Sequence, residues 1–245
     1  MTDRPAVECL DLGLISFQEA WTIQERYFEE VVERKKRNRD KPEDLQETRK
    51  HYLLFCEHPH VYTLGRNGKA DHLLIDEQKL KAVGAEFLPI NRGGDITYHG
   101  PGQLVGYPIL DLDDFTTDIH EYLRRLEEVV IRTLGSYGLV AERSVGETGV
   151  WLDTDGGRPR KICAMGIRAS RWVTMHGWAL NHQVDMRYFD YIVPCGIQGK
   201  AVTSMDRELG GSNPGRKEVR DELVRSFSEV FNCTCRWPKN SSNAH

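Results

Sequence analysis

The chain contains 245 residues, 39% of them hydrophobic and 29% charged, which is the composition of an ordinary globular protein. A formal net charge of −4 excludes the overall basic balance of a general nucleic-acid binder, so no nucleic-acid partner is expected. There is no run of about 18 apolar residues and no apolar signal segment at the start, so we expect a cytoplasmic protein without a membrane partner.

The pattern predicts one domain over residues 1–237 and a disordered tail at 238–245. Residues 10–14 predict a short strand, and Ser16-Phe-Gln-Glu19 is a capping-box sequence that starts a helix. Apolar residues at helical spacing extend this helix to about Lys36. The charge-rich stretch 33–50 is expected to be a solvated helix end and a mobile connection.

The middle of the chain alternates short strands and one short helix. Strands are expected at residues 51–56, 61–65 and 87–90, and a helix at 77–83. Residues 103–112 predict a further strand, and Pro108 within it indicates an edge strand or a bulge.

The second half begins with the clearest helix, at 118–134, where apolar residues form one stripe. Strands are expected at 149–152, 161–169 and 172–181, and a final helix at 216–231. Only Ser170-Arg171 separates the last two strands, so they should form a hairpin. The predicted class is α+β, with a mixed, largely antiparallel sheet backed by helices.

Residues 92–102, Arg-Gly-Gly-Asp-Ile-Thr-Tyr-His-Gly-Pro-Gly, form the densest motif of the chain. Glycines at this density let backbone N–H groups come close to a ligand, and Arg92 can hold a carboxylate, a phosphate or a carbonyl oxygen. The motif is neither a Walker A loop nor a dinucleotide fingerprint. A purely structural glycine turn is the alternative.

Lys161 stands at the head of the otherwise apolar strand Lys161-Ile-Cys-Ala-Met-Gly166. Lysine avoids such a position unless it is paired or exposed at a strand end. Beside a cysteine, its charge would favour the thiolate, and its neutral amine could act as a general base. A lysine at the edge of the sheet is the alternative.

Pro194-Cys195-Gly196 places a cysteine between a rigid and a flexible residue. The glycine would let a substrate carbonyl approach Cys195, which we interpret as a nucleophile. The alternative is a buried cysteine in a tight turn, and His99 or His176 could replace Lys161 as the base. The other cysteines are expected to stay reduced, and the spacing of Cys233-Thr-Cys235 indicates no metal site.

Four motifs together resemble the ordered signatures of the octanoyltransferases of lipoate biosynthesis. They are the segments 92–103, 161–166, 176–181 and 194–196, and the resemblance covers nearly the whole chain. It implies a fold similar to the catalytic domains of biotin protein ligases and lipoate ligases. The implied enzyme is an octanoyl-[acyl carrier protein]:protein N-octanoyltransferase.

The resemblance also implies the site. Cys195 would carry the octanoyl group as a thioester, and Lys161 would lower the pKa of its thiol. The substrate-binding positions carry over to Arg92, Gly93, Gly94, Asp95, Ile96, Thr97, Tyr98, His99, Ala164, Met165, Gly166, Gly177, Trp178 and Ala179.

The implied partners are octanoyl-acyl carrier protein as donor and, as acceptors, lipoyl domains of 2-oxoacid dehydrogenase E2 subunits and the glycine cleavage H protein. No metal and no cofactor are expected, because thioester exchange is near neutral in free energy and needs no ATP.

Two residues depart from the family pattern. Cys163 stands where a small residue is common, and alternation along the strand predicts that it shares a face with Lys161, which leaves a second reactive thiol open. Met165 stands where isoleucine or leucine is usual and could reshape an acyl pocket.

Residues 156–184 carry no acidic residue but hold several cations, Arg158, Arg160, Lys161, Arg168 and Arg171. This composition predicts a basic strip that steers an acidic carrier protein. A solvated hairpin tip is the alternative.

Three other functions remain open from the sequence: an ATP-dependent lipoate or biotin ligase, a non-catalytic acyl-carrier-binding protein, and a papain-like hydrolase. A requirement for ATP would identify the ligase, and the hydrolase would need a dedicated Cys–His pair. The presence of both Cys195 and Lys161 favours the transferase over the ligase and over the non-catalytic protein.

Overall fold

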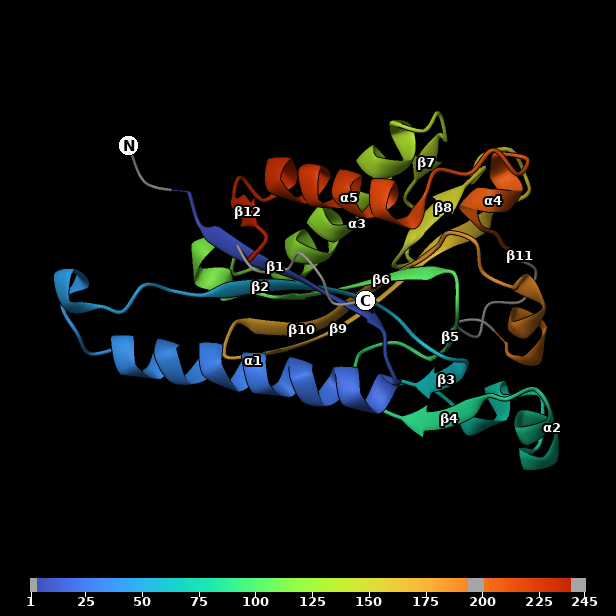
Figure 1. Cartoon of the computed structure of the whole chain (residues 1–245), viewed down its shortest axis with the longest axis horizontal. Helices are drawn as coiled ribbons and strands as arrows, with labels where there is room; N and C mark the ends of the chain where they lie inside the picture. The colour runs from blue at the N-terminus through green and yellow to red at the C-terminus, as the bar shows by residue number, and fades with distance from the viewer. Residues whose placement is uncertain (1–3, 194–200, 239–245) are drawn as a thin grey trace.

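The computed structural model describes residues 4–193 and 201–238, and a large mixed sheet dominates this part of the chain (Figure 1). Its strands are β1 (Ala6–Leu14), β2 (His51–Glu57), β6 (Gln103–Ile109), β7 (Ala141–Glu142), β8 (Val150–Leu152), β9 (Arg160–Ser170), β10 (Val173–Asn181), β11 (Ala201–Val202) and β12 (Thr234–Arg236). They follow the order β12-β1-β2-β6-β10-β9-β8-β7, and β11 also pairs with β9. Most pairs are antiparallel, whereas β1 is parallel to β2 and β12, and β11 is parallel to β9.

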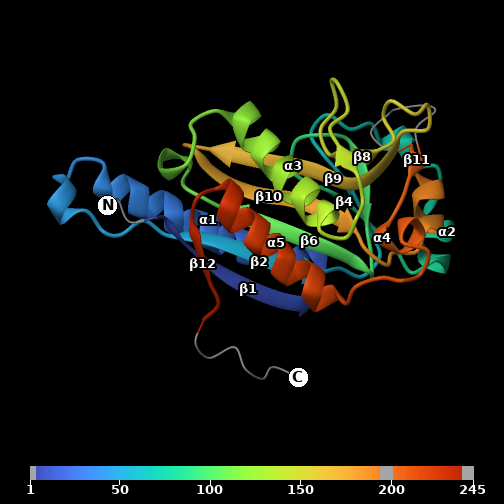
Figure 2. The ribbon, with the colours of Figure 1, turned by 90° about the horizontal axis from the view of Figure 1, so that it is seen from above.

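Helices cover both faces of this sheet. Helix α1 (Phe17–Asn38) lies against one face, and α3 (Ile119–Gly135) and α5 (Arg216–Val230) lie side by side on the other (Figures 1 and 2). Strand β2 is buried from both sides: Leu53 packs toward α3 and α5, whereas Leu54 packs toward α1. This alternation follows the two-residue period of a strand and gives the sheet two hydrophobic cores.

A smaller sheet holds β3 (Val61–Leu64) between β4 (Glu86–Pro89) and β5 (Ile96–His99). The short helices of the described chain are α2 (Glu77–Ala82) and α4 (Met205–Glu208), with 3-10 turns at Glu43–Leu45, Ala70–His72, Leu112–Asp114 and Met186–Tyr191. Because β5 leads through a short turn into β6, the glycine-rich motif connects the two sheets.

The structure confirms the predicted α+β class with its mixed, largely antiparallel sheet. It also confirms the start of α1, where the Ser16 hydroxyl accepts a hydrogen bond from the Glu19 backbone N–H at 3.2 Å. The interpretation of Pro108 as a mark of an edge strand is wrong, because β6 lies between β2 and β10. The irregularity lies instead on β10, where His176 has a φ of 60°, and the β6–β10 pairing ends at Gly106 before it reaches Pro108.

Residues 33–50 are mostly exposed, as predicted, and side-chain contacts tie the end of α1 and the connection after it to the rest of the fold. The buried Asn38 side chain bonds both backbone groups of Glu47, at 2.7 and 2.8 Å, and so closes the connection after α1. Lys35 bonds the buried Asp111 carboxylate at 2.6 Å, which anchors the end of α1 to the sheet. The sequence missed these contacts because their partners lie elsewhere along the chain.

In the part of the chain that the structure describes, no helix has both the length and the apolar character needed to cross a membrane. From residue 239 onward, the predicted tail lies outside the described residues.

Candidate active site

A narrow cavity of about 50 Å³ lies where β9, β10 and the loop before β5 meet. It is lined by Phe17, Arg92, Gly94, Asp95, Ile96, Thr97, His99, Tyr107, Lys161, Ala164, Met165, Gly166, His176, Gly177, Trp178 and Ala179. Apart from Gly93 and Tyr98, every substrate-binding residue carried over from the family resemblance is in this lining. Tertiary folding therefore brings together three sequence segments that are far apart along the chain.

Arg92 fixes the glycine-rich loop against the smaller sheet. Its guanidinium donates hydrogen bonds to the carbonyl and the hydroxyl of the buried Thr63 at 2.9 and 3.0 Å, and to the Gly93 carbonyl at 2.9 Å. These bonds orient the buried guanidinium and leave it as a fixed positive charge at the cavity wall.

The two predicted residues outside the lining act from behind it. Gly93 donates its backbone N–H to the Ile167 carbonyl at 2.9 Å and so attaches the loop to β9. Tyr98 is fully buried on the opposite side, where its hydroxyl bonds His60 at 2.7 Å and its ring stacks on Tyr188. Both residues therefore support the loop and do not contact the cavity.

Small residues are required where β9 and β10 face each other beside the cavity. Gly166 and Gly177 are paired across the two strands. A Cβ atom on Gly177 would lie 2.3 Å from the Gly106 carbonyl oxygen, and one on Gly166 would lie 2.9 Å from the Gly93 carbonyl oxygen. Any larger side chain would displace backbone, so the glycines define the shape of the cavity.

Lys161 enters the cavity from the start of β9. Its side chain is buried, with 7% of the residue exposed, and its ammonium nitrogen lies 4.6 Å from the centre of the Trp151 ring. Its carbonyl accepts the backbone N–H of Thr203 at 2.9 Å, next to the pairing of Val202 with Lys161. Strands on both sides thus hold the backbone of Lys161, and the alternative of a lysine exposed at the sheet edge is wrong.

The histidines of the cavity are neutral. Burial lowers the pKa of His176 to about 3 and lowers the pKa of His99 well below its ordinary value. The Nδ1 atom of His99 lies 3.2 Å from Oε1 of Gln103, whose amide donates to Asn181 and to the Tyr98 carbonyl. Since that oxygen can only accept, Nδ1 of His99 carries the ring proton in this network.

Cys163 belongs to the core and does not line the cavity. The register changes from Trp151 opposite Lys161 to Val150 opposite Cys163, so Ile162 is an extra residue on β9. This bulge interrupts the alternation that placed Cys163 on the face of Lys161, and that prediction is wrong. Cys163 is fully buried, and burial raises the pKa of its thiol, so it is no second reactive thiol.

Cys195, the predicted nucleophile, lies outside the described residues. Phe17, Tyr107 and His176 line the cavity although they were not among the predicted substrate-binding residues. Phe17 stacks on His99, and Tyr107 bonds His58 at 2.7 Å. His176 had a signal in sequence, because it directly precedes Gly177, whereas nothing near Phe17 indicated a site.

The cations of the predicted basic strip are spread along the whole of β9, and part of their charge is paired. Arg160 and Ser170 bound a strand of eleven residues, so its ends lie about 30 Å apart at a rise of about 3.3 Å per residue. Arg160 is neutralised by Glu208 at 2.7 Å and Asp153 at 3.2 Å, and the Arg168 guanidinium packs 5.3 Å from the centre of the Phe28 ring. Arg158 and Arg171 lie beyond opposite ends of β9.

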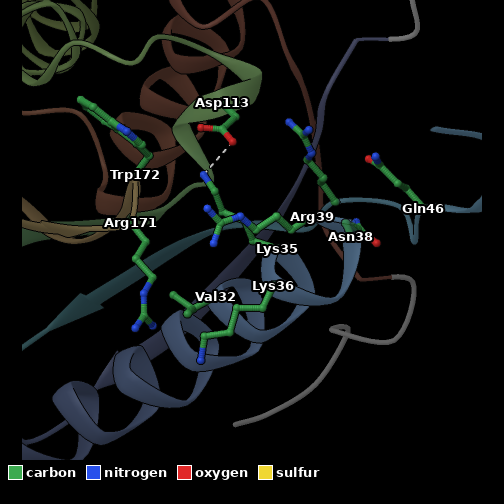
Figure 3. A pocket seen from close by; sticks show the side chains of 10 residues that line it. Val32, Lys35, Lys36, Asn38, Arg39, Gln46, Asp113, Arg171 and Trp172 are labelled. Carbon is green, nitrogen blue, oxygen red and sulfur yellow. Dashed lines mark ion pairs between the residues drawn. The ribbon is translucent and has the colours of Figure 1, made fainter. Parts of the chain in front are cut away.

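A larger groove of about 680 Å³ lies at the far end of β9, between the β9–β10 hairpin and the end of α1 (Figure 3). It is lined by Val32, Lys35, Lys36, Asn38, Arg39, Gln46, Arg49, Asp113, Arg171 and Trp172. Its lysines are largely neutralised, since Lys35 pairs with Asp113 at 2.8 Å and Lys36 with Glu33 at 2.5 Å. None of the predicted site residues lines this groove.

The mixed sheet with helices on both faces has the fold of the lipoate ligases. A bipartite lipoate protein ligase from Thermoplasma acidophilum superposes with a TM-score of 0.68, at 20% identity over 95% of this chain and 86% of the other. A lipoate-protein ligase A bound with ATP gives a TM-score of 0.67 at 19% identity, over 97% and 89% of the two chains. At these identities the likeness is one of fold.

Sequence comparison identifies the family. Residues 16–228 match the lipoyl protein ligase A/B catalytic domain, and the chain belongs to this family. It is 58% identical to an octanoyltransferase from Christiangramia forsetii, over 94% of this chain and 98% of that protein. An octanoyltransferase from Flavobacterium psychrophilum is 54% identical over 93% and 97%. These relatives confirm the resemblance seen in the motifs and the predicted enzyme class, an acyltransferase of lipoate biosynthesis.

Proposed function

We propose that the enzyme moves an octanoyl group from octanoyl-acyl carrier protein to the lysine of a lipoyl domain, through a thioester on Cys195. Its acceptors are lipoyl domains of 2-oxoacid dehydrogenase E2 subunits and the glycine cleavage H protein. The observation that carries the proposal is the buried Lys161 in a glycine-lined cavity. The octanoyltransferase relatives support the choice of acyl group.

The chain that follows Cys195 supports a role for Lys161 beside it. Residues Ala201 and Val202 form β11, which pairs with Arg160 and Lys161 of β9. The Thr203 N–H then bonds the Lys161 carbonyl. The segment 194–200 is therefore followed directly by residues that lie alongside the lysine.

In the first step the Cys195 thiolate attacks the donor thioester, forming one carbon–sulfur bond while the bond to the carrier thiol breaks. The Lys161 ammonium gives its proton to the departing thiolate and becomes a neutral amine. In the second step the acceptor lysine attacks the Cys195 thioester and forms an amide, and its proton passes to Lys161. The thiolate and the ammonium are both restored, so no ATP is consumed.

The cavity would hold the octanoyl chain. We assign this role to the predicted residues that line it, with Gly93 and Tyr98 as supports of the loop. At about 50 Å³ the cavity holds only a few waters, so the chain requires a side chain to move. Met165 is the flexible, partly exposed residue of the lining and is the side chain we expect to move.

Intact-mass spectrometry tests the covalent step. Incubation with octanoyl-carrier protein should add one octanoyl group to the enzyme, and the Cys195→Ala variant should show no such addition and no transfer to a lipoyl domain. Native-rate transfer by Cys195→Ala would overturn the proposal. A strict requirement for ATP would favour a ligase instead.

A comparison of Lys161→Ala with His99→Gln tests the identity of the base. We expect the lysine variant to lose more activity, because the buried His99 is neutral and its Nδ1 proton is directed at Gln103. The opposite ranking in single-turnover transfer would indicate a Cys–His pair.

A further inference from the structure

Trp151 lies directly opposite Lys161 in the pairing of β8 with β9, beside the bulge at Ile162. The lysine nitrogen lies 4.6 Å from the centre of the indole ring, within the range of a cation–π interaction. Both residues are buried, with 2% of Trp151 and 7% of Lys161 exposed.

An aromatic face attracts a cation and has no comparable attraction for a neutral amine, and the attraction grows when water is excluded. The Trp151 ring therefore stabilises the ammonium form of Lys161 against the cost of burying a charge. In the proposed cycle this is the form that accompanies the Cys195 thiolate. The ring thus stabilises Lys161 in the resting enzyme, and it favours the second step, in which Lys161 receives a proton.

A buried carboxylate supports this arrangement from α3. Glu127 is fully buried and accepts the backbone N–H of Gly149 at 3.0 Å, while Arg124 and Arg143 pair with it at 2.7 and 3.2 Å. Gly149 has a φ of 118°, and a Cβ atom there would lie 3.4 Å from Cε of Lys161. The lysine stem is therefore confined between the turn before β8 and the Trp151 ring.

Other charged and titratable groups face this region from several elements. They are Arg92, Asp95, His99 and His176 in the cavity, Glu127 on α3, Cys163 and Arg160 on β9, and Glu208 on α4, which pairs with Arg160. None of them belongs to β8, so replacing the Trp151 ring changes the lysine environment without removing a charge.

We propose that Trp151 is a positioning residue that holds Lys161 as an ammonium ion at the wall of the cavity. The inference rests on the proposed function, because it assigns Lys161 to the stabilisation of the Cys195 thiolate. Removing the ring should make the ammonium less stable, so that the thiolate forms only at higher pH.

The experiment measures the rate at which iodoacetamide alkylates Cys195 as a function of pH, quantified on the Cys195 peptide by mass spectrometry. For Trp151→Leu we expect the ionisation limb to move to higher pH, with alkylation below the limb slower by about 3- to 30-fold. Trp151→Phe keeps a weaker aromatic face and should give a smaller shift in the same direction. Single-turnover acylation by octanoyl-carrier protein should follow the same order.

Trp237→Leu is the matched control, because Arg220 lies 4.5 Å from the centre of that ring in a second cation–π pair far from Lys161 along the chain. Its limb should coincide with that of the native enzyme. A folded Trp151→Leu variant with an unmoved limb would overturn the inference even if its overall rate falls, since a structural role lowers the rate at every pH. If Trp151→Leu does not fold, the Trp151→Phe variant provides the test: an ionisation limb at the native pH in that variant would overturn the inference.

The Cys195→Ala variant separates the two proposals. If it transfers octanoyl groups at the native rate, the proposed function fails. If it is inactive while the limbs of both Trp151 variants match that of the native enzyme, only the role of Trp151 fails.

Discussion

The two ends of β9 each place a cation beside a tryptophan, in opposite surroundings. At the start of the strand, Lys161 and Trp151 are buried beside a cavity of about 50 Å³. Beyond its end, Arg171 and Trp172 form the hairpin turn over a groove of about 680 Å³, and 42% of Trp172 is exposed. The larger hollow lies at the end that lacks every predicted site residue.

The two ends differ in burial and in support as well as in volume. A buried charge interacts strongly with its neighbours because little water screens it, whereas exposed ion pairs contribute little. Lys161 is also held by β8, β10 and β11 through the strand ladder of β9, whereas Arg171 lies in a two-residue turn. The fixed, desolvated lysine is therefore the one suited to proton transfer.

The largest expected effect is on the rate of octanoyl transfer when the buried lysine is replaced. Lys161→Met should reduce octanoyl transfer by about 10²- to 10⁴-fold, the usual contribution of a general acid–base group. Arg171→Met, at the other end of the strand, should change the rate by less than about twofold because an exposed cation interacts weakly. Single-turnover transfer measures both, and an equal loss in the two variants would contradict the assignment of the site.

The contacts that hold the lysine end of β9 should contribute to the free energy of unfolding. Glu127→Ala removes a fully buried carboxylate and leaves the Gly149 N–H without its acceptor, so we expect a loss of about 3 kcal/mol in the free energy of unfolding. Glu33→Ala removes the exposed partner of Lys36 near the groove and should cost much less. Urea denaturation compares the two, and similar losses would show that the α3 contact does not stabilise the site.

The neutral histidines at the lysine end predict a pH dependence. Burial lowers the pKa of His58 to about 4 and of His176 to about 3, so below about pH 6.5 the unfolded chain binds protons that the folded chain does not. As the pH is lowered below about 6.5, the free energy of unfolding should therefore decrease. Each such histidine should contribute a decrease of about 1.4 kcal/mol per pH unit until the pH reaches its pKa in the folded protein. His176→Asn, which tolerates the left-handed backbone, should reduce this slope between about pH 6.5 and pH 5 in urea unfolding.

His120 provides the control for this measurement, because it is exposed on α3. The slope of His120→Gln is the reference with which the slope of His176→Asn is compared. An unchanged slope in His176→Asn would show that this imidazole takes up its proton in the folded protein.

The smallest effect concerns the hairpin turn. Arg171 and Trp172 have φ values of 53° and 61°, which suit Asn-Gly better than two residues with long side chains. Replacing both with Asn-Gly should therefore stabilise the fold by about 0.5–1 kcal/mol, measured as a rise in melting temperature. A fall would show that the Trp172 side chain contributes packing that outweighs the strain of the turn.

Local patterns in the sequence determined much of this protein. The Ser16–Glu19 capping box located the start of α1, the apolar stripe of 118–134 located α3, and the order of four motifs indicated the enzyme family. These features depend on neighbouring residues or on preserved motifs, so a single sequence contains them. The position of Lys161 at the head of an apolar strand was readable for the same reason.

Only the tertiary structure decided which residues meet. The Ile162 bulge turned Cys163 into the core, the pairing of β8 with β9 set Trp151 against Lys161, and the length of β9 spread the expected basic strip over about 30 Å. Phe17 reached the cavity from the start of α1. Such contacts depend on sheet order and register, and a shift of one residue in register exchanges the faces of a strand. The spacing of residues along the chain does not determine strand order or register, because both are set when the sheet and its helices pack together.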